Sequence, residues 1–311
     1  MSYRQALPQL SGGTFVTDGG METTLIFRDG LELPCFAAFA LLRTEAGTDA
    51  LRAYFRPYLE VARDRGVGLV LDAPTWRANP DWGAKIGYTA GELDAVNRKA
   101  VALLEEVRSG EPGPVVVSGC VGTRGDGYRP GELMSAAEAE RYHAAQVETF
   151  ADTTADLVSA LTMTYVEEAI GVVRAAKRAE LPVVISFTVE TDGRLPSGTA
   201  LADAIDRVDA ETDGAAAYFM VNCAHPTHFA HVLEDGSPWT DRIRGVRANA
   251  SRKSHAELDE SEELDEGDPA ELADQYTAPR PRLRNVNVVG GCCGTDHRHI
   301  AAICDAWQSA A

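Results

Sequence analysis

The sequence predicts a single (β/α)8 barrel of the TIM type, with residues 1–311 forming one domain. Three observations support this fold. Short apolar or β-branched runs alternate with amphipathic stretches, there are eight such pairs, and the unusual residues cluster just after the runs. In a barrel of this kind, the loops at the carboxyl ends of the strands carry the chemistry.

The eight predicted strands are the apolar runs at 14–17, 67–73, 114–118, 156–161, 182–188, 215–221, 243–248 and 285–289. Candidate helices lie near 45–65, 90–109, 134–153, 165–180, 199–209, 225–234, 269–275 and 296–308. The helix near 134–153 has the clearest start, because Ser135 is followed three residues later by Glu138, the spacing of a capping box. Parallel strands need such helical crossovers, so the alternation favours a parallel sheet.

A doubly wound open sheet is the alternative fold. It needs fewer strands and usually opens with a glycine fingerprint of the GxGxxG kind. Here Gly19 and Gly20 are followed by Met21, Glu22 and Thr23, so the fingerprint is missing. The barrel is therefore the preferred prediction.

The charge balance excludes two classes of partner. With 29 basic and 47 acidic side chains, the chain carries a formal charge of −18, whereas nucleic acids and anionic membranes bind concentrated basic surfaces. No apolar run approaches the roughly 20 residues of a membrane-spanning helix, and residues 1–10 lack the apolar core of a signal peptide. We expect a cytoplasmic protein with no nucleic-acid or membrane partner.

The segment 256–272 is strongly acidic and of low complexity. Runs of like charge are usually solvated, so we predict a solvated loop or partly ordered insertion there. A metal-collecting or partner-binding role is the less favoured alternative.

Six cysteines are too few for a disulfide scaffold in a chain of 311 residues. In a reducing compartment we expect them to be thiols, available for metal binding or nucleophilic chemistry. The strongest local signal is the sequence Gly-Gly-Cys-Cys-Gly-Thr at 290–295. Adjacent side chains on a strand point to opposite faces, so Cys292 and Cys293 can reach one metal ion only if the backbone turns sharply, as the flanking glycines permit.

A third thiol, Cys223, ends the sixth predicted strand. Its carboxyl end and that of the eighth strand open onto the same mouth of a barrel, so three thiolates can meet there. Three protein ligands with an open fourth position are typical of a catalytic zinc site, and an all-thiolate set favours Zn²⁺ over Mg²⁺ or Mn²⁺. The alternative is that one cysteine simply packs in the core.

The combination of Asp18-Gly19-Gly20, Asn222-Cys223 and the 290–295 motif resembles the homocysteine S-methyltransferase family over about residues 13–308. The resemblance implies a zinc-dependent barrel in which Cys223, Cys292 and Cys293 hold the ion. It further implies that Asp18 binds the amino group of the acceptor, with the backbone around Gly19, Gly20 and Met21 holding its carboxylate. Thr162 and Asn222 complete the implied substrate contacts.

One position departs from the family pattern. Members that use homocysteine commonly carry a Glu-Thr pair at the end of the fourth strand, where the Glu also contacts the amino group, but this chain has Leu161 before Thr162. Losing one of two anionic contacts weakens the inference of homocysteine without affecting the inference of zinc. Three other carboxylates are candidate substitutes: Glu22, Glu167 and Glu190.

Other residues carry weaker signals. His225, His228 and His231 lie at a spacing of three and form a possible second metal site, but a helix with partly exposed histidines is the preferred interpretation. Trp76 and Arg77 follow the second strand and are candidates to line a donor pocket, where Arg77 would bind a carboxylate. Among the remaining cysteines, Cys120 is predicted to be a small packed residue.

The predicted function is methyl transfer from a sulfonium donor to a zinc-bound thiol. The resemblance implies S-methylmethionine or S-adenosylmethionine as donor and homocysteine as the first choice of acceptor, giving methionine, with another thiol or a selenol as alternatives. A zinc hydrolase is disfavoured because hydrolases generally bind zinc through His and carboxylates. A non-catalytic zinc- or thiol-binding barrel is a second alternative. The sequence leaves the oligomeric state open.

Overall fold

The computed structural model describes residues 2–233, 237–261 and 263–310, and its eight strands form a closed parallel barrel in the order β1 to β8. All eight predicted strands are confirmed. They are β1 Phe15–Thr17, β2 Gly68–Asp72, β3 Val115–Val121, β4 Leu157–Met163, β5 Val183–Phe187, β6 Tyr218–Asn222, β7 Ile243–Ala248 and β8 Val288–Gly291. The barrel closes because β1 pairs with both β2 and β8, with Phe15 opposite Gly68 on one side and Val288 on the other.

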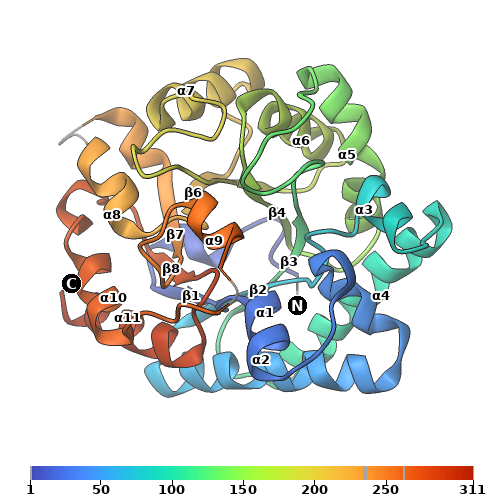
Figure 1. Cartoon of the computed structure of the whole chain (residues 1–311), viewed down its shortest axis with the longest axis horizontal. Coiled ribbons are helices and arrows are strands. Elements are labelled where there is room, and N and C mark those ends of the chain that lie inside the picture. The colour runs from blue at the N-terminus through green and yellow to red at the C-terminus, as the bar shows by residue number, and fades with distance from the viewer. Residues whose placement is uncertain (1, 234–236, 262, 311) are drawn as a thin grey trace.

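The helices surround the strands as a ring (Figure 1). The described α-helices are α1 Met21–Thr23, α2 Glu45–Arg65, α3 Pro80–Lys85, α4 Ala90–Arg108, α5 Ala136–Ala151, α6 Val166–Arg178, α7 Leu201–Thr212, α8 Pro226–Phe229, α9 His255–Asp259, α10 Pro269–Thr277 and α11 His297–Ser309. Each predicted helix overlaps one of them, although the segment at 225–234 forms only α8 and a 3-10 turn, and residue 234 lies outside the described residues. The short α1, α3 and α9 had no predicted counterpart.

Capping fixes where several of these helices begin. At α5, the Ser135 side chain accepts from the Glu138 amide while the Glu138 carboxylate accepts from the Ser135 amide, which confirms the predicted capping box. Asp296 caps α11 by accepting from the Arg298 amide. This second cap sets the direction in which the chain leaves the 290–295 motif.

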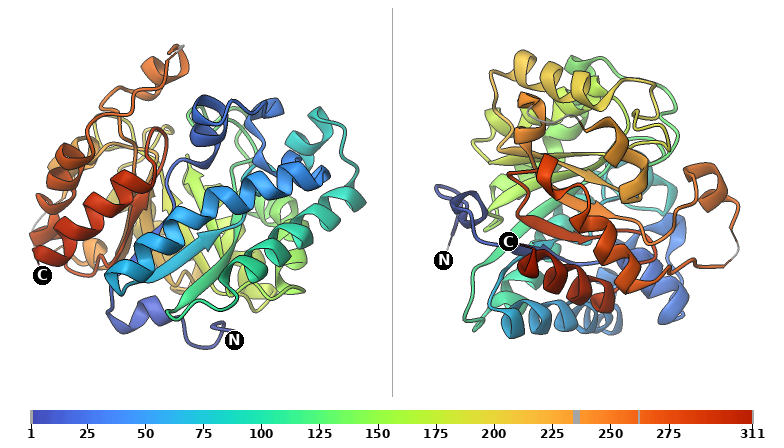
Figure 2. Two further views of the ribbon diagram at one scale, coloured as in Figure 1. Left: turned by 90° about the horizontal axis from the view of Figure 1, so that it is seen from below. Right: turned by 90° about the vertical axis from the view of Figure 1, so that its left-hand side faces the viewer.

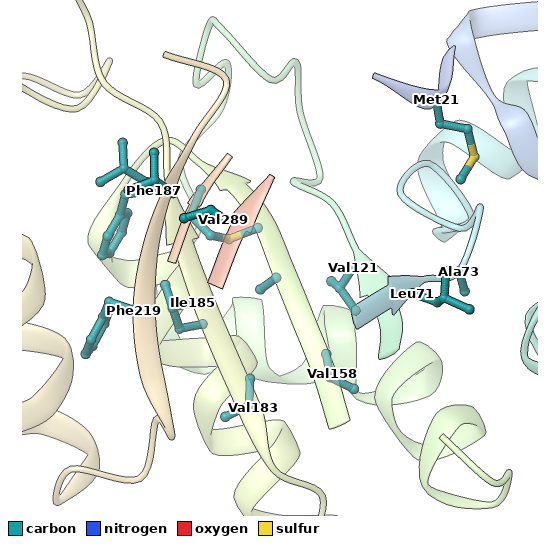
Figure 3. Packing of buried hydrophobic residues seen from close by; sticks show 14 of the residues in the cluster. Met21, Leu71, Ala73, Val121, Val158, Val183, Ile185, Phe187, Phe219 and Val289 are labelled. Atoms are coloured by element: carbon teal, nitrogen blue, oxygen red, sulfur yellow. The ribbon is translucent and has the colours of Figure 1, made fainter. Parts of the chain in front are cut away.

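The strands bury both faces, and alternate side chains serve two different cores. Val184 points into the barrel, whereas its neighbours Val183 and Ile185 pack between the barrel and the helices (Figure 3). Phe187 and Phe219 stack in this outer layer with ring centroids 6.2 Å apart. Because side chains fill the barrel interior, any ligand must bind above it, at the ends of the strands.

One end of the barrel carries most of the irregular structure. The segments around α1 and α9 project from this end, and the N-terminus lies at the opposite end (Figure 2). The acidic segment 256–272, expected to be a solvated loop or partly ordered insertion, contains most of α9 and the start of α10, each begun by a capping side chain from Ser254 or Asp268. Among residues 2–233, 237–261 and 263–310, no helix is both long and apolar enough to span a bilayer.

A buried ion pair ties the opposite end of the barrel together. The Asp156 carboxylate, which is fully buried, accepts from Arg108 at 2.6 Å, from the Val117 amide at 3.0 Å and from the Tyr3 amide at 2.6 Å. We predict that Asp156→Ala lowers the free energy of unfolding by about 3 kcal/mol, because it removes the fully buried carboxylate that pairs with Arg108 and accepts from the Val117 and Tyr3 amides. Urea denaturation followed by circular dichroism measures this, with Asp152→Ala, at an exposed ion pair to Arg98, as the control that changes little. Equal effects of the two substitutions would contradict the prediction.

Candidate active site

A pocket of about 420 Å³ opens at the carboxyl ends of the strands. It is lined by the loops after β1, β2, β3, β4, β6 and β8 and by the segment that includes α9. All nine residues that the sequence singled out for ligand or substrate contact line it, and they are Asp18, Gly19, Gly20, Met21, Thr162, Asn222, Cys223, Cys292 and Cys293. The barrel has therefore gathered segments that lie up to 275 residues apart in the chain.

Three cysteines meet at the floor of the pocket. The sulfur atoms of Cys223, Cys292 and Cys293 lie within 4.8 Å of one another, and this is the one group of potential metal ligands that the described residues form. Cys223 follows β6 in the left-handed region, with a φ of 52°. After β8 the chain turns back, with the Thr295 amide donating to the Cys292 carbonyl at 3.1 Å and Gly294 at a φ of 79°. This is the sharp turn that the flanking glycines were expected to permit.

The oxidation state of the cysteines differs from the expectation of free thiols. The structure joins Cys223 and Cys292 in a disulfide, with their Cα atoms 5.4 Å apart, and leaves Cys293 free. A disulfide and a shared metal ion both require sulfur atoms from two strands to lie close together, so the same convergence serves either state. Because metal ions bind the thiolate form, reduction must precede metal binding here.

Each of the three sulfur atoms has one hydrogen-bond donor within reach. Thr162 Oγ1 lies 3.9 Å from the sulfur of Cys223, Asn222 Nδ2 lies 3.9 Å from that of Cys292, and Tyr128 Oη lies 3.7 Å from that of Cys293. Donors of this kind favour the thiolate over the thiol and orient metal ligands. Burial has the opposite effect and raises the pKa of the Cys293 thiol to about 11.

Asn222 and Thr162 form a connected pair. The Asn222 carbonyl oxygen accepts from the Thr162 amide at 2.9 Å and from the Ser186 hydroxyl at 2.6 Å, which fixes its amide nitrogen toward Thr162 Oγ1 and Cys292. Thr162 sits at a φ of 62°, where the register between β4 and β5 shifts. This irregularity aims its side chain at Cys223 rather than into the next layer of the barrel.

Sequence analysis missed Tyr128 and His255. The Tyr128 ring stacks on the His255 imidazole at 4.1 Å, and His255 is held by the Cys223 carbonyl at 2.9 Å and the Glu190 carboxylate at 3.0 Å. Tyr128 lies in an irregular loop after β3, and His255 begins α9 in the acidic region. Neither carries a periodic or spacing signal that would identify it.

Asp18 lies in a buried cluster of three charges. Its carboxylate accepts from Arg247 at 2.5 Å and from the Tyr54 hydroxyl at 3.0 Å, and Arg247 also pairs with Asp72. Burial, opposed by Arg247 and reinforced by Asp72, raises the pKa of Asp18 to about 6. The cluster carries one net negative charge when both acids are ionised. One oxygen of Asp72, Oδ1, has no hydrogen-bond partner among the described residues.

Gly19 and Gly20 allow the loop after β1 to pack directly on the loop after β8. A Cβ atom on Gly19 would lie 2.6 Å from the Thr295 carbonyl oxygen, and one on Gly20 would lie 2.6 Å from the Cys292 carbonyl oxygen. The Gly20 amide already donates to Thr295 at 3.0 Å. These glycines therefore hold the cysteine turn against Asp18, and a larger side chain at either position would separate them.

Of the three carboxylates considered as substitutes for the missing Glu at position 161, only Glu22 lines the pocket. Glu167 pairs with Arg207 at 2.8 Å, and Glu190 is held by His255. Leu161 itself is buried and lines the pocket. Burial raises the pKa of Glu22 to about 7.

The other candidate residues lie apart from the cysteine cluster. His225 caps α8 by accepting from the Thr227 amide, and His228 contacts the Arg252 carbonyl, while His231 is exposed. They form no metal cluster within the described part of the chain. Cys120 is buried in the barrel interior, as predicted, and also lines the pocket.

A closed (β/α)8 barrel with three cysteines gathered in a pocket at the carboxyl ends of its strands is the architecture of a barrel enzyme with a cysteine-ligated metal site. Residues 15–307 match the family described as homocysteine S-methyltransferase, and the chain belongs to this family. It is therefore a methyltransferase. No curated protein sequence matches the chain.

Solved structures of the homocysteine methyltransferase MmuM from Escherichia coli are similar in fold. The metallated form is 21% identical, with a TM-score of 0.71, and the alignment covers 94% of this chain and 96% of that one. The oxidized form is also 21% identical, with a TM-score of 0.73 and coverage of 97% and 99%. At this level of identity the likeness supports the fold, over nearly the whole length of both chains.

We predict that the reduced protein binds about one zinc ion per chain and that Cys292→Ser abolishes this binding, because two remaining thiolates hold the ion far less tightly than three. Metal analysis after gel filtration measures the ratio. Cys35→Ser is the matched control, since Cys35 is an exposed free cysteine, and it should retain the ion. Zinc retained by Cys292→Ser would place the metal elsewhere.

Proposed function

We propose that this protein is a zinc-dependent methyltransferase that moves a methyl group from S-methylmethionine or S-adenosylmethionine to homocysteine, giving methionine. The observation that carries the proposal is the group of three pocket-lining cysteine sulfurs, each with its own hydrogen-bond donor. The family supports the class of reaction.

The residues present fit a zinc ion. Tetrahedral zinc with bonds of about 2.3 Å to sulfur places its sulfur ligands about 3.8 Å apart, within the 4.8 Å limit of this cluster. Three thiolates and three hydrogen-bond donors make a soft, oriented site that suits Zn²⁺ better than harder ions. When bound, the ion would hold the acceptor sulfur as a thiolate at neutral pH.

The rest of the chemistry belongs to the protein's own side chains. Asp18 would receive the acceptor's ammonium group, as the family resemblance implies, while Arg247 and Tyr54 fix the carboxylate in place. The acceptor's carboxylate would accept a hydrogen bond from the Met21 amide, because the Gly20 amide already donates to the Thr295 carbonyl. Leu161 and Cys120 make part of the pocket wall apolar, which excludes water from the reacting sulfur atoms.

The pocket also suits a cationic donor. Seven acidic residues line it against two arginines, and the acidic ones are Asp18, Glu22, Asp72, Asp126, Asp259, Glu263 and Asp265. Three of these come from the acidic segment, which therefore contributes to the pocket rather than standing free in solvent. Such a field raises the local concentration of a sulfonium compound and repels anions.

The alternatives fit the pocket less well. A hydrolase would need a harder metal site with His or carboxylate ligands, and the cysteine cluster contains neither. A non-catalytic barrel that had kept the metal site but lost its substrate pocket would not have a lined cavity of about 420 Å³ beside its cysteines. A different thiol or a selenol as acceptor remains the second candidate, because Leu161 removes one anionic contact.

The reduced, zinc-loaded protein should form methionine from homocysteine and S-methylmethionine or S-adenosylmethionine, and Cys292→Ala should reduce the rate at least 100-fold. Mass spectrometry of product with an isotope-labelled donor methyl group measures the transfer. Bound zinc without turnover on either donor would overturn homocysteine as the acceptor.

The Michaelis constant for homocysteine should rise as the pH falls below about 6. Asp18 has a pKa raised from 3.8 to about 6, so it is ionised above that value and loses its charge, and with it the ammonium contact, as the pH falls. The rise should approach tenfold per pH unit. Steady-state kinetics from pH 5 to 8 measure it, and 3-mercaptopropionate, which lacks the amine, should not show it. A flat profile for homocysteine would exclude Asp18 as the ammonium contact.

A further inference from the structure

Arg77 occupies an unusual place in the pocket wall. It follows β2, lines the pocket and is only 8% exposed. Its guanidinium lies between two indole rings, 4.5 Å from the ring centroid of Trp76 and 3.5 Å from that of Trp82. The two rings fix the plane of the guanidinium, so its N–H groups have a defined direction.

The hydrogen bonding of this guanidinium is incomplete. Its nearest carboxylate, that of Asp126, is 3.7 Å away, beyond hydrogen-bond distance, and its Nε atom has no partner among the described residues. A buried guanidinium normally has its donors satisfied by carboxylates or carbonyls. Burial lowers the pKa of Arg77, and the charges of Asp126 and Glu22 oppose this effect. A ligand with acceptor oxygens would complete the site.

Two carboxylates accompany Arg77. Asp126 is half-exposed in the loop after β3, and Glu22 is partly buried on α1, and each interacts electrostatically with the guanidinium. Glu22 makes no ion pair within the described residues. When ionised, the three side chains carry one net negative charge. The guanidinium can bind a ligand carboxylate, and the two carboxylates can bind a ligand ammonium group.

We propose that Arg77 binds the carboxylate of the methyl donor and that Glu22 and Asp126 receive its ammonium group. This inference rests on the proposed function and assigns a binding site to the amino-acid group that S-methylmethionine and S-adenosylmethionine share. S-methylmethionine carries a carboxylate, an ammonium and a sulfonium, for a net charge of +1, which the one net negative charge of the three side chains balances. A sulfonium without the amino-acid group would leave Arg77 without its missing acceptor.

The position of Arg77 in the barrel assigns it to the donor rather than the acceptor. In a closed barrel ordered β1 to β8, β2 lies across from β6, and Cys223 directly follows β6. In the proposed function the acceptor sulfur binds at the cysteines and the acceptor's amino group lies beside Asp18, which follows β1. A donor anchored at Arg77 approaches that sulfur from the opposite wall, as in-line transfer of a methyl group requires.

Three sulfonium donors separate the contributions. S-methylmethionine has both amino-acid charges, dimethylsulfoniopropionate has the carboxylate alone, and trimethylsulfonium has neither. We expect Arg77→Gln to raise the Michaelis constant about 10- to 100-fold for the first two donors and to leave trimethylsulfonium unchanged. Glu22→Gln should raise the Michaelis constant for S-methylmethionine alone, because it is the one donor of the three with an ammonium group. Both variants should retain the wild-type Michaelis constant for the acceptor.

Lys85→Met is the matched control for Arg77→Gln. Lys85 lies over the same Trp82 ring, 3.6 Å from its centroid, but does not line the pocket, so its loss removes an equal charge without affecting the donors. Thermal denaturation and zinc content verify that each variant folds and loads. Arg77→Lys keeps the charge but not the fork geometry and should recover only part of the affinity.

Direct binding keeps this proposal separate from the proposed function. Isothermal titration calorimetry of S-methylmethionine and trimethylsulfonium with the wild-type protein and Arg77→Gln measures the dissociation constant of each donor in the absence of turnover. Arg77-dependent binding of S-methylmethionine without methyl transfer would support the carboxylate site and overturn the function. Three results would each overturn the carboxylate site. The first is turnover by Arg77→Gln with unchanged Michaelis constants for the donors, and the second is a rise in the Michaelis constant for the acceptor instead. The third is a failure of the wild-type protein to bind S-methylmethionine.

Discussion

Closure of the barrel is the constraint on which the site depends. Since β1 pairs with both β2 and β8, the carboxyl ends of all eight strands open onto one mouth, and Cys223 meets a pair of cysteines about 70 residues further along the chain. Gly19 and Gly20 then press the loop after β1 onto the cysteine turn. The sulfur cluster and the Asp18 cluster are thus held by the same backbone contacts, so neither can move without the other.

The strands could be predicted because their residues are buried on both faces and form continuous apolar runs. The cysteines could be predicted because adjacent thiols between glycines have few structural uses. Tyr128 and His255 could not, since their position beside Cys293 and Cys223 arises only from tertiary packing between an irregular loop and α9. The disulfide also could not, because three neighbouring thiols are equally consistent with a metal site. A charge within an apolar run is a usable signal: Asp72 and Arg247, near the ends of their strands, form the buried ion pair.

The acidic segment shows that composition can indicate exposure to solvent without indicating the local structure of a segment. Its charge does face solvent in part, yet Ser254 and Asp268 cap two short helices within the region, and α9 supplies His255 to the ring stack on Tyr128. Its carboxylates also line the pocket. Solvation of the segment and a role in the site are compatible, because a pocket for a cationic substrate is itself a solvated acidic surface until the ligand binds.

The one departure from the family pattern, Leu161, lies in the same pocket as the charged cluster of Asp18, Asp72 and Arg247. Leu161 cannot make the contact to an ammonium group that the family's Glu makes. In addition, the positive charge of Arg247 lies beside the Asp18 carboxylate. If Arg247 stood alone it would repel an ammonium group, but Asp72 returns the cluster to one net negative charge and leaves its own Oδ1 unpartnered. An incoming ammonium would neutralise that charge and satisfy that oxygen. The net negative charge of this cluster is therefore the feature on which homocysteine rests as the proposed acceptor despite Leu161.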